Sequence, residues 1–306
     1  MIYTLTLNPS IDYYVTLPVF EAGQVNRVEQ AEKVAGGKGI NVSLVLKNYE
    51  VETQALGFLG GSTGQFIRTE LEKRGVLTDF TPIQDETRIN VKIRADQESE
   101  LNAAGPKIQP EELEHLLSRF KTMQAGDIVV FAGSIPSSLP HDLYRHIATI
   151  LNERDVRFAV DTTKEAMLEV LPLGPFLIKP NHHELGEIFD VDITSKEMAV
   201  PYAQQLVERG AENVVISFAG DGALLVNRQG AYTANTPAGK LVNSVGAGDS
   251  LVAGFVASHA LGKSPEEAFR YAVTTGSASA YSFGLCTKED IDRLLEDVNV
   301  VELIQS

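Results

Sequence analysis

The segment Asp127–Asp161, DIVVFAGSIPSSLPHDLYRHIATILNERDVRFAVD, decides the fold. It holds an apolar run, then an amphipathic stretch at helical spacing over 142–155, then a second apolar run. Short apolar runs bounded by turn residues predict buried strands, and the stretch between them predicts a helix. A strand, a helix and a second strand in this order form the unit from which parallel sheets are built.

The same alternation extends in both directions along the chain. Strand patterns YTLTL, QALGFLG and FLIKP are each followed by helical patterns, INVSLVLKNY, GQFIRTELEKRG and HHELGEIF. From Asn213 onward the strand patterns NVVISF, ALLVN and GAYTA follow each other closely, and helices are expected over 247–262, 265–281 and 287–296. The sequence therefore predicts one α/β domain over 1–306, with helices on both faces of a mostly parallel sheet.

Two stretches, roughly 11–35 and 86–104, interrupt this alternation. Each has strand-type spacing with no helix after it, as in TRINVKIR, where Ile89, Val91 and Ile93 share one face. We interpret them as a small sheet that projects from the main domain. At the carboxyl ends of the parallel strands it would cover a ligand, although a peripheral hairpin without a role has the same pattern.

Composition narrows the classes of function. The chain has 306 residues, 43% of them hydrophobic, and 41 acidic against 26 basic residues give a formal charge of −15. This charge disfavours binding to nucleic acid and to anionic membranes. The single cysteine, Cys286, excludes a disulfide within the chain, and no run is apolar and long enough for a membrane span. We expect a cytoplasmic protein.

The segment NSVGAGDS, Asn243–Ser250, opens a predicted helix. Gly246 and Gly248 permit a tight turn whose backbone N–H groups remain free, and the helix dipole adds partial positive charge there. Such a turn binds anions, and Asp249 in the first helical turn would deprotonate a hydroxyl beside a bound phosphoryl group. An ordinary glycine-rich helix start has the same sequence pattern.

The segment GGKGIN, Gly36–Asn41, also precedes a helical pattern. Its spacing is not that of a P-loop, because Lys38 lies only two residues after Gly36. The glycines permit close approach of a ligand, Lys38 offers a point charge for a phosphate, and Asn41 offers hydrogen bonds. A flexible turn with a solvated lysine is an equally good interpretation.

The segment KPNHHE, Lys179–Glu184, has the spacing of a helix-capping box, with Asn181 as the cap and Glu184 three residues later. Glu184 could also lie near Mg²⁺ or its water molecules. Zinc is disfavoured, because the adjacent residues His182 and His183 diverge on a helix and the HExxH spacing is absent.

Four further side chains are candidates for contact with a substrate. Asp12 follows the first strand and could bind hydroxyl groups or close a turn, and Ser134 follows a later strand. Arg27 and Arg88 lie in the two interrupting stretches and could bind a phosphate through two hydrogen bonds each. The same residues could also be exposed groups without a ligand.

Taken in order, NPSID, GGKGIN, TRINVK, AGSIPSSLP, KPNHHELGE and NSVGAGDS resemble the motifs of the ribokinase-like sugar kinases, the PfkB family. The resemblance covers nearly the whole chain. It implies a doubly wound α/β domain with a β-sheet lid, ATP and Mg²⁺ as cofactors, a sugar phosphate as substrate, and a homodimer that forms through the lid.

The resemblance also implies roles for individual residues. Asp249 is the expected catalytic base, with Gly246, Ala247 and Gly248 as the anion hole. The sugar phosphate is expected at Asp12, Gly37, Lys38, Asn41, Arg88, Ser134 and Arg27. The nucleotide is expected at Lys179, Asn181, Glu184, Ser217, Gly220 and Gly222, with Glu184 reaching Mg²⁺ indirectly.

Within the family, GGKGIN, TRINVK and NHHE are most similar to the bacterial kinases that phosphorylate D-fructose 1-phosphate at its 6-hydroxyl. Kinases of tagatose 6-phosphate are close relatives and stay an alternative. A non-catalytic sugar-phosphate sensor is an alternative of another class, although an intact GAGD and Glu184 argue against it. A nicotinamide dehydrogenase is disfavoured because no GxGxxG follows the first strand. Some family members bind a monovalent cation. Because Asn243-Ser244 replaces the Asp-Thr of many relatives, the sequence does not decide whether this chain has such a site.

Overall fold

The computed structural model describes residues 1–303. Its main sheet has ten strands in the order β14-β13-β12-β11-β10-β9-β8-β1-β4-β5. The strands from β11 to β5 run parallel, and β12, β13 and β14 are antiparallel additions at one edge. The strands are β1 (Ile2–Thr6), β4 (Thr53–Gly60), β5 (Leu77–Ile83), β8 (Ile128–Ala132), β9 (Arg157–Asp161), β10 (Leu177–Ile178), β11 (Asn213–Ser217), β12 (Ala223–Asn227), β13 (Gly230–Ala234) and β14 (Val300–Glu302).

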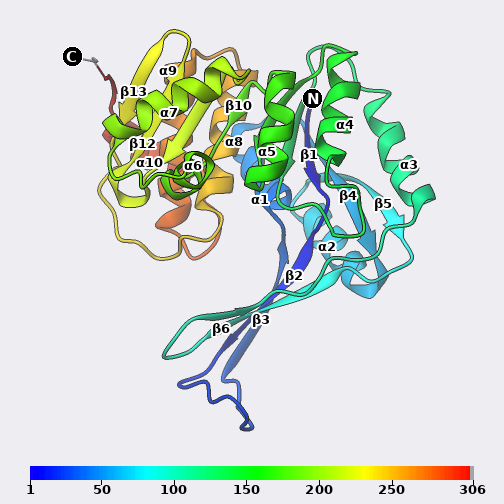
Figure 1. Cartoon of the computed structure of the whole chain (residues 1–306). Helices are drawn as coiled ribbons and strands as arrows, with labels where there is room; N and C mark the ends of the chain where they lie inside the picture. Colours follow the sequence, from blue (N-terminus) through cyan, green and yellow to red (C-terminus); the bar gives the residue numbers. More distant parts are fainter. Residues whose placement is uncertain (304–306) are drawn as a thin grey trace.

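Helices cover both faces of this sheet, as predicted (Figure 1). One layer contains α3 (Pro110–Phe120), α4 (Leu143–Asn152), α5 (Lys164–Val170), α6 (His182–Phe189) and α7 (Lys196–Glu208). The other contains α1 (Lys38–Leu46), α2 (Gly61–Lys73), α8 (Ala247–Ala260), α9 (Pro265–Ala280) and α10 (Lys288–Leu294).

Strand β8 shows why the deciding segment is apolar throughout. All of its residues are buried, with Val129 and Phe131 facing the first helix layer and Val130 facing the second. Phe131 stacks on Tyr144 of α4, with ring centroids 5.0 Å apart. A strand that is buried on both faces has no position for a polar side chain, so its sequence does not alternate.

The strand expected from FLIKP is shorter than its pattern. Strand β10 has two residues, Leu177 and Ile178. Pro180 has no N–H to donate to a neighbouring strand, and pairing resumes only as an isolated bridge between Asn181 and Ser217. The chain leaves the sheet there and starts α6.

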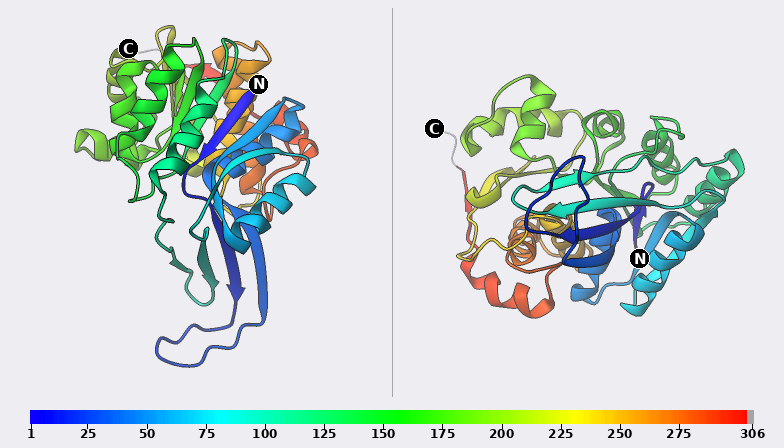
Figure 2. Two further views of the ribbon diagram at one scale, coloured as in Figure 1. Left: turned by 90° about the vertical axis from the view of Figure 1, so that its right-hand side faces the viewer. Right: turned by 90° about the horizontal axis from the view of Figure 1, so that it is seen from below.

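A second sheet of four strands, in the order β3-β2-β6-β7, projects from the main domain (Figures 1 and 2). We call it the lid sheet. It consists of β2 (Ser10–Thr16), β3 (Gln30–Gly36), β6 (Arg88–Arg94) and β7 (Ser99–Leu101). These strands lie in the two stretches that interrupt the strand–helix alternation of the sequence.

Register gives the lid sheet two different faces. Asp12 lies beside Asn90 and Ser10 beside Arg88, which places these polar side chains on one face. Tyr13 lies beside Val91 on the other face. Alternation along a strand therefore separates a polar face from an apolar one.

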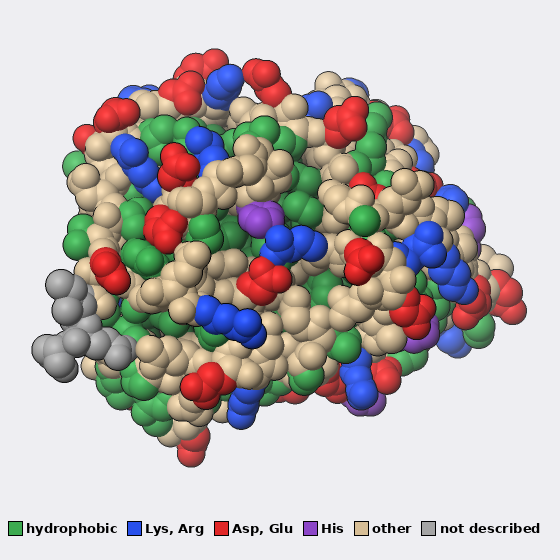
Figure 3. Space-filling view, turned by 90° about the horizontal axis from the view of Figure 1, so that it is seen from above, with side chains coloured by type: hydrophobic (Ala, Val, Ile, Leu, Met, Phe, Trp, Pro, Cys, Tyr) green, Lys and Arg blue, Asp and Glu red, His purple; other side chains and the backbone are tan. Residues whose placement is uncertain are grey.

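The lid sheet leaves the main domain at the carboxyl ends of the parallel strands, since β1 runs from the chain's start toward the lid (Figure 1). The opposite end of the molecule carries acidic and basic side chains that are interspersed, without a broad area of one sign (Figure 3). Among residues 1–303, no helix is both long and apolar enough to cross a bilayer.

Candidate active site

A cavity of about 520 Å³ lies between the lid sheet and the carboxyl ends of the parallel strands. Most of the residues predicted from the sequence to bind substrate or to react line it. They are Asp12, Gly37, Lys38, Asn41, Arg88, Ser134, Lys179, Glu184, Gly246, Gly248 and Asp249. Segments from distant parts of the chain therefore meet at one site, as expected where open α/β sheets bind ligands.

The amino end of α8 forms one wall of this cavity. Gly246 caps the helix in the left-handed conformation, with φ of 80°, and Ala247 is its first residue. A residue with a side chain would be strained at this φ, which explains the glycine. The N–H groups of the first helical turn have no carbonyl partner within the helix, so this wall is suited to an anion.

Asp249 lies in that first turn and is buried, with 6% of its surface exposed. Its Oδ2 accepts a hydrogen bond of 2.7 Å from Nδ2 of Asn41 in α1. Burial, together with the negative charge of Asp161, raises the pKa of Asp249 to about 6 from an ordinary value of 3.8. The carboxyl group is thus a stronger base than an exposed aspartate.

Asp161, at the end of β9, is buried beside two lysines. Its Oδ1 lies 3.1 Å from Nζ of Lys38 and 3.5 Å from Nζ of Lys179. Burial by itself would raise the pKa of Asp161, but the charges of Lys179 and Lys38 hold it below its usual value. Asp161 in turn raises the pKa of Lys38 to about 12. Asp161 and Lys38 are therefore charged at neutral pH.

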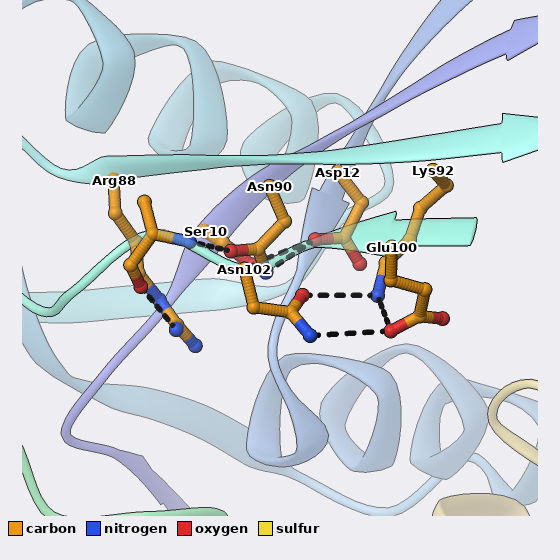
Figure 4. Close-up of polar contacts among 8 residues, drawn as sticks. Ser10, Asp12, Arg88, Asn90, Lys92, Glu100 and Asn102 are labelled. Carbon is orange, nitrogen blue, oxygen red and sulfur yellow. Dashed lines mark hydrogen bonds and ion pairs between the residues drawn. The ribbon is translucent and has the colours of Figure 1, made fainter. Parts of the chain in front are cut away.

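The lid sheet supplies the other end of the cavity. Figure 4 shows the polar contacts that its side chains make there. Oδ1 of Asp12 accepts hydrogen bonds from Oγ of Ser10 at 2.8 Å and from Nδ2 of Asn90 at 3.1 Å. Arg88 donates to the backbone carbonyls of Ala103 and Asn8, each at 3.0 Å. These contacts fix the positions of Asp12 and of the Arg88 guanidinium.

Arg88 differs from the other basic residues on the polar face of the lid sheet. Lys92 forms an ion pair of 2.6 Å with Glu100, and the guanidinium of Arg94 lies over the ring of Tyr14. Among the described residues Arg88 has no carboxylate partner within ion-pair distance, and its Nε is buried without a hydrogen-bond acceptor. Its positive charge is available to an anion in the cavity.

The residues predicted to hold a nucleotide lie along the same end of the sheet, but several lie outside the cavity. Asn181 caps α6 and forms the predicted capping box with Glu184, whose own carboxylate reaches the cavity wall. Ser217 ends β11 beside Asn181. Gly220 lines a separate hollow of about 540 Å³, and Gly222 follows it in the same turn.

Arg27 is not brought to the cavity. It lies in the loop between β2 and β3, and it is not among the residues that line the site. Figure 2 shows this loop at the far end of the lid sheet. Its contact with a sugar phosphate stays a prediction.

Comparison with known proteins shows which family this chain is similar to. The model of the pfkB family carbohydrate kinases matches residues 5–292. The chain belongs to this family. It is 52% identical to the 1-phosphofructokinase of Bacillus subtilis over 303 residues, which cover 99% of this chain and 100% of the relative.

Two further proteins are similar to this chain at lower sequence identity. A tagatose-6-phosphate kinase of Staphylococcus epidermidis is 34% identical over 314 residues, covering 99% of this chain and all of the relative. The structure of phosphofructokinase-2 from Escherichia coli in complex with substrates and products has a TM-score of 0.90 at 28% identity, covering 96% of this chain and 98% of the other. The predicted fold is confirmed.

Asp161 and Asn90 are among the polar residues of the site that were not predicted from the sequence. Asp161 ends an apolar strand, RFAVD, and a carboxylate at the carboxyl end of a buried parallel strand was the signal that could have identified it. Asn90 alternates with the apolar residues of TRINVKIR, so its polar neighbours became visible only from the pairing of β2 with β6. Asp161 holds Lys38 and Asn90 holds Asp12, and both Lys38 and Asp12 were predicted site residues.

Replacing Asp249 with asparagine should make the protein more stable at neutral and alkaline pH. The folded-state pKa of about 6 exceeds the ordinary 3.8, so the folded state binds more protons, and wild-type stability falls as pH rises through this interval. The introduced amide would carry no charge, and its oxygen could still accept from Asn41. We expect a gain of ~1–3 kcal/mol at about pH 8 that shrinks as the pH falls toward about 5.

Urea unfolding at several pH values measures this difference. The exposed Asp192 provides the matched control, since Asp192→Asn should leave the pH dependence of stability unchanged. A variant Asp249→Asn that is less stable than the wild type at about pH 8 would contradict the assignment of a strained, buried charge.

Proposed function

We propose that the protein transfers the γ-phosphoryl group of ATP to the 6-hydroxyl of D-fructose 1-phosphate and so forms fructose 1,6-bisphosphate. The observation that carries this proposal is the pairing of a buried carboxylate, Asp249, with the amino end of α8 in a cavity that has cations at both ends. The whole-chain identity of 52% to a 1-phosphofructokinase supports the choice of sugar.

In the proposed step, Asp249 takes the proton of the 6-hydroxyl while the oxygen of that hydroxyl attacks the γ-phosphorus. A new O–P bond forms, the bond between the γ-phosphorus and the bridging oxygen breaks, and ADP leaves with the electron pair. The N–H groups of Gly248 and Asp249, at the start of α8, would stabilise the charge on the transferred group, while the N–H of Ala247 already donates to the carbonyl of Ser244 at 3.3 Å. An aspartate with a pKa of about 6 is ionised at neutral pH and ready to accept the proton.

The sugar phosphate would lie along the lid end of the cavity. Arg88, with its unpaired Nε, is suited to the 1-phosphate, and Ser134 lies on the facing wall. Asp12, fixed by Ser10 and Asn90, can accept hydrogen bonds from sugar hydroxyls. Gly37 also lines the cavity, and a side chain is disfavoured there because an added Cβ would lie 2.7 Å from Cγ2 of Thr6.

ATP and Mg²⁺ fit the remaining walls. Oε2 of Glu184 accepts from the backbone N–H of Asn181, and Oδ2 of Asp161 is buried without a partner. Carboxylate oxygens are the donors that Mg²⁺ prefers, often through its own water molecules. Bound there, the ion would neutralise phosphate charge, while Lys179 adds a fixed positive charge beside α8. Asn181, Ser217, Gly220 and Gly222 would then face the rest of the nucleotide.

Two alternatives remain distinguishable by experiment. A kinase of tagatose 6-phosphate would hold the fixed phosphate at the other end of the sugar, and a relative with that name is 34% identical. A sugar-phosphate sensor without catalysis would have no need for a base, and the raised pKa of Asp249 argues against it.

Specificity constants for fructose 1-phosphate, tagatose 6-phosphate and fructose 6-phosphate test the proposal, in a coupled assay that follows ADP. We expect kcat/KM to be highest for fructose 1-phosphate. Asp249→Asn should still bind this sugar but lose at least ~10²-fold in kcat. A preference for either 6-phosphate would refute the substrate, and near-normal turnover in the variant would refute the base.

We also propose that two copies of the chain pair through the apolar face of the lid sheet. Val15 and Ile93 are buried there, but Ile89 and Leu101 on the same face are 43% and 60% exposed. Exposed apolar groups on a projecting sheet need a cover. The polar face of the same sheet lines the cavity, so a second lid sheet would cover the apolar face while the cavity stays open.

Sedimentation measures this assembly. We expect wild-type protein to sediment as a dimer and the double variant Ile89→Asp/Leu101→Asp to sediment as a monomer, because buried unpaired carboxylates oppose association. Leu261 is 56% exposed at the end of α8, so Leu261→Asp is the control and should stay dimeric. A monomeric wild type, or a double variant that remains dimeric, would contradict the proposal.

A further inference from the structure

The cations of the cavity lie in two separate groups. Arg88 is at the lid end, where it donates hydrogen bonds to the carbonyls of Asn8 and Ala103. The negative charge that acts on its guanidinium there is that of Asp12. Lys38 and Lys179 are at the other end, paired with Asp161. Two anionic groups could therefore be held at the same time, one at each end.

Lys38 belongs to the end of the cavity where Asp249 lies. The negative charges that act on Lys38 are, in order of effect, those of Asp161, Asp249 and Glu184. Its helix, α1, also carries Asn41, whose Nδ2 donates to Oδ2 of Asp249 at 2.7 Å. These contacts place Lys38 on the side of the cavity where Asp249 lies.

Lys179 links this pair of lysines to the anion-binding end of α8. A Cβ atom built on Gly248 would lie 3.3 Å from Nζ of Lys179. Lys179 and Lys38 share Oδ1 of Asp161. The ammonium group of Lys38 is therefore separated by one carboxylate oxygen from the lysine that lies against the first turn of α8.

Exposure separates the roles of the three charged residues. The side chains of Asp161 and Lys179 are only 3% and 7% exposed, whereas that of Lys38 is 42% exposed. Asp161 and Lys179 are part of the wall. Lys38 is the member of the group that extends into the cavity, where it can contact a ligand while Asp161 holds its position.

The chemistry of the substrate distinguishes the two ends. In fructose 1-phosphate the phosphate is on C1 and the reacting hydroxyl is on C6, at opposite ends of the molecule. If that hydroxyl lies at Asp249, the 1-phosphate lies away from it, and the group nearest Asp249 is the phosphoryl group in transfer. A cation next to Asp249 therefore meets the transferred group.

We propose that Lys38 binds the phosphoryl group in transfer, not the phosphate already on the sugar, and that Asp161 positions Lys38 for this contact. The inference rests on the proposed function for the identity of the sugar. Lys38 would donate to an equatorial oxygen of the γ-phosphoryl group while the 6-oxygen attacks and ADP leaves. The proton of the hydroxyl goes to Asp249, and Lys38 keeps its own proton throughout.

This role has a consequence for kinetics that differs from that of Arg88. Charge on the transferred group is redistributed in the transition state, so a cation placed there raises kcat. A cation that holds the fixed phosphate binds the ground state and the transition state alike, and its loss raises KM and the dissociation constant of the sugar. The two variants should therefore separate the two effects.

The experiment compares Lys38→Gln with Arg88→Gln in full-length protein. Steady-state kinetics give kcat, and calorimetric titration with fructose 1-phosphate in the absence of ATP gives its dissociation constant. For Lys38→Gln we expect kcat to fall by ~10²–10³-fold, as for other removed electrostatic donors, with the dissociation constant within about threefold of wild type. For Arg88→Gln we expect the dissociation constant to rise by roughly 10–100-fold with a smaller change in kcat.

Two further variants complete the test. Lys38→Arg keeps a cation beside Asp161 and should recover at least about tenfold in kcat over Lys38→Gln. Lys121→Gln, at an exposed lysine after α3, should match the wild type in both measurements. Thermal melting verifies that each variant is folded.

The proposal is overturned if Lys38→Gln weakens fructose 1-phosphate binding as much as Arg88→Gln does while kcat stays within about threefold of wild type. Absence of any recovery in Lys38→Arg would also count against it. If the wild type prefers tagatose 6-phosphate, the proposed function fails, and the role of Lys38 is then decided with that sugar by the same comparison of kcat with the dissociation constant.

Discussion

Asp161 and the two lysines beside it are the interaction on which the active-site cavity depends. A buried carboxylate without a cation would be costly, and so would a buried ammonium group without an anion. Together, Asp161, Lys38 and Lys179 keep charge at the carboxyl ends of the parallel strands, directly beside the amino end of α8. In a chain with a formal charge of −15, this local positive group is what makes the site suitable for phosphates.

The same group sets the properties of Asp249. Burial and the negative charge of Asp161 raise its pKa, while Lys38 and Lys179 act in the opposite direction. The result is a carboxylate that is ionised at neutral pH but binds a proton more readily than an exposed aspartate. This charge is held in place at a cost in stability, because burial favours the protonated form.

The sequence was sufficient for the fold and for most of the site because the relevant patterns are local. Apolar runs such as IVVFA show strands buried on both faces, and Gly246 and Asp249 lie within a few residues of each other. Asp161 and Asn90 were not found, because their significance depends on pairing between distant segments: β9 ends beside the start of α1, and β6 lies beside β2. The direction of Lys38 likewise could not be read from GGKGIN, since only the fold shows which carboxylate it meets.

The proposed cavity has two phosphate-binding ends, one at Arg88 and one at Lys38. The most direct measurement is a crystal structure of the protein with fructose 1-phosphate and a non-hydrolysable ATP analogue. We expect the 1-phosphate at Arg88, and the γ-phosphate between the first turn of α8 and Nζ of Lys38, with the 6-hydroxyl at Asp249. A 1-phosphate bound to Lys38, with the γ-phosphate elsewhere, would contradict it.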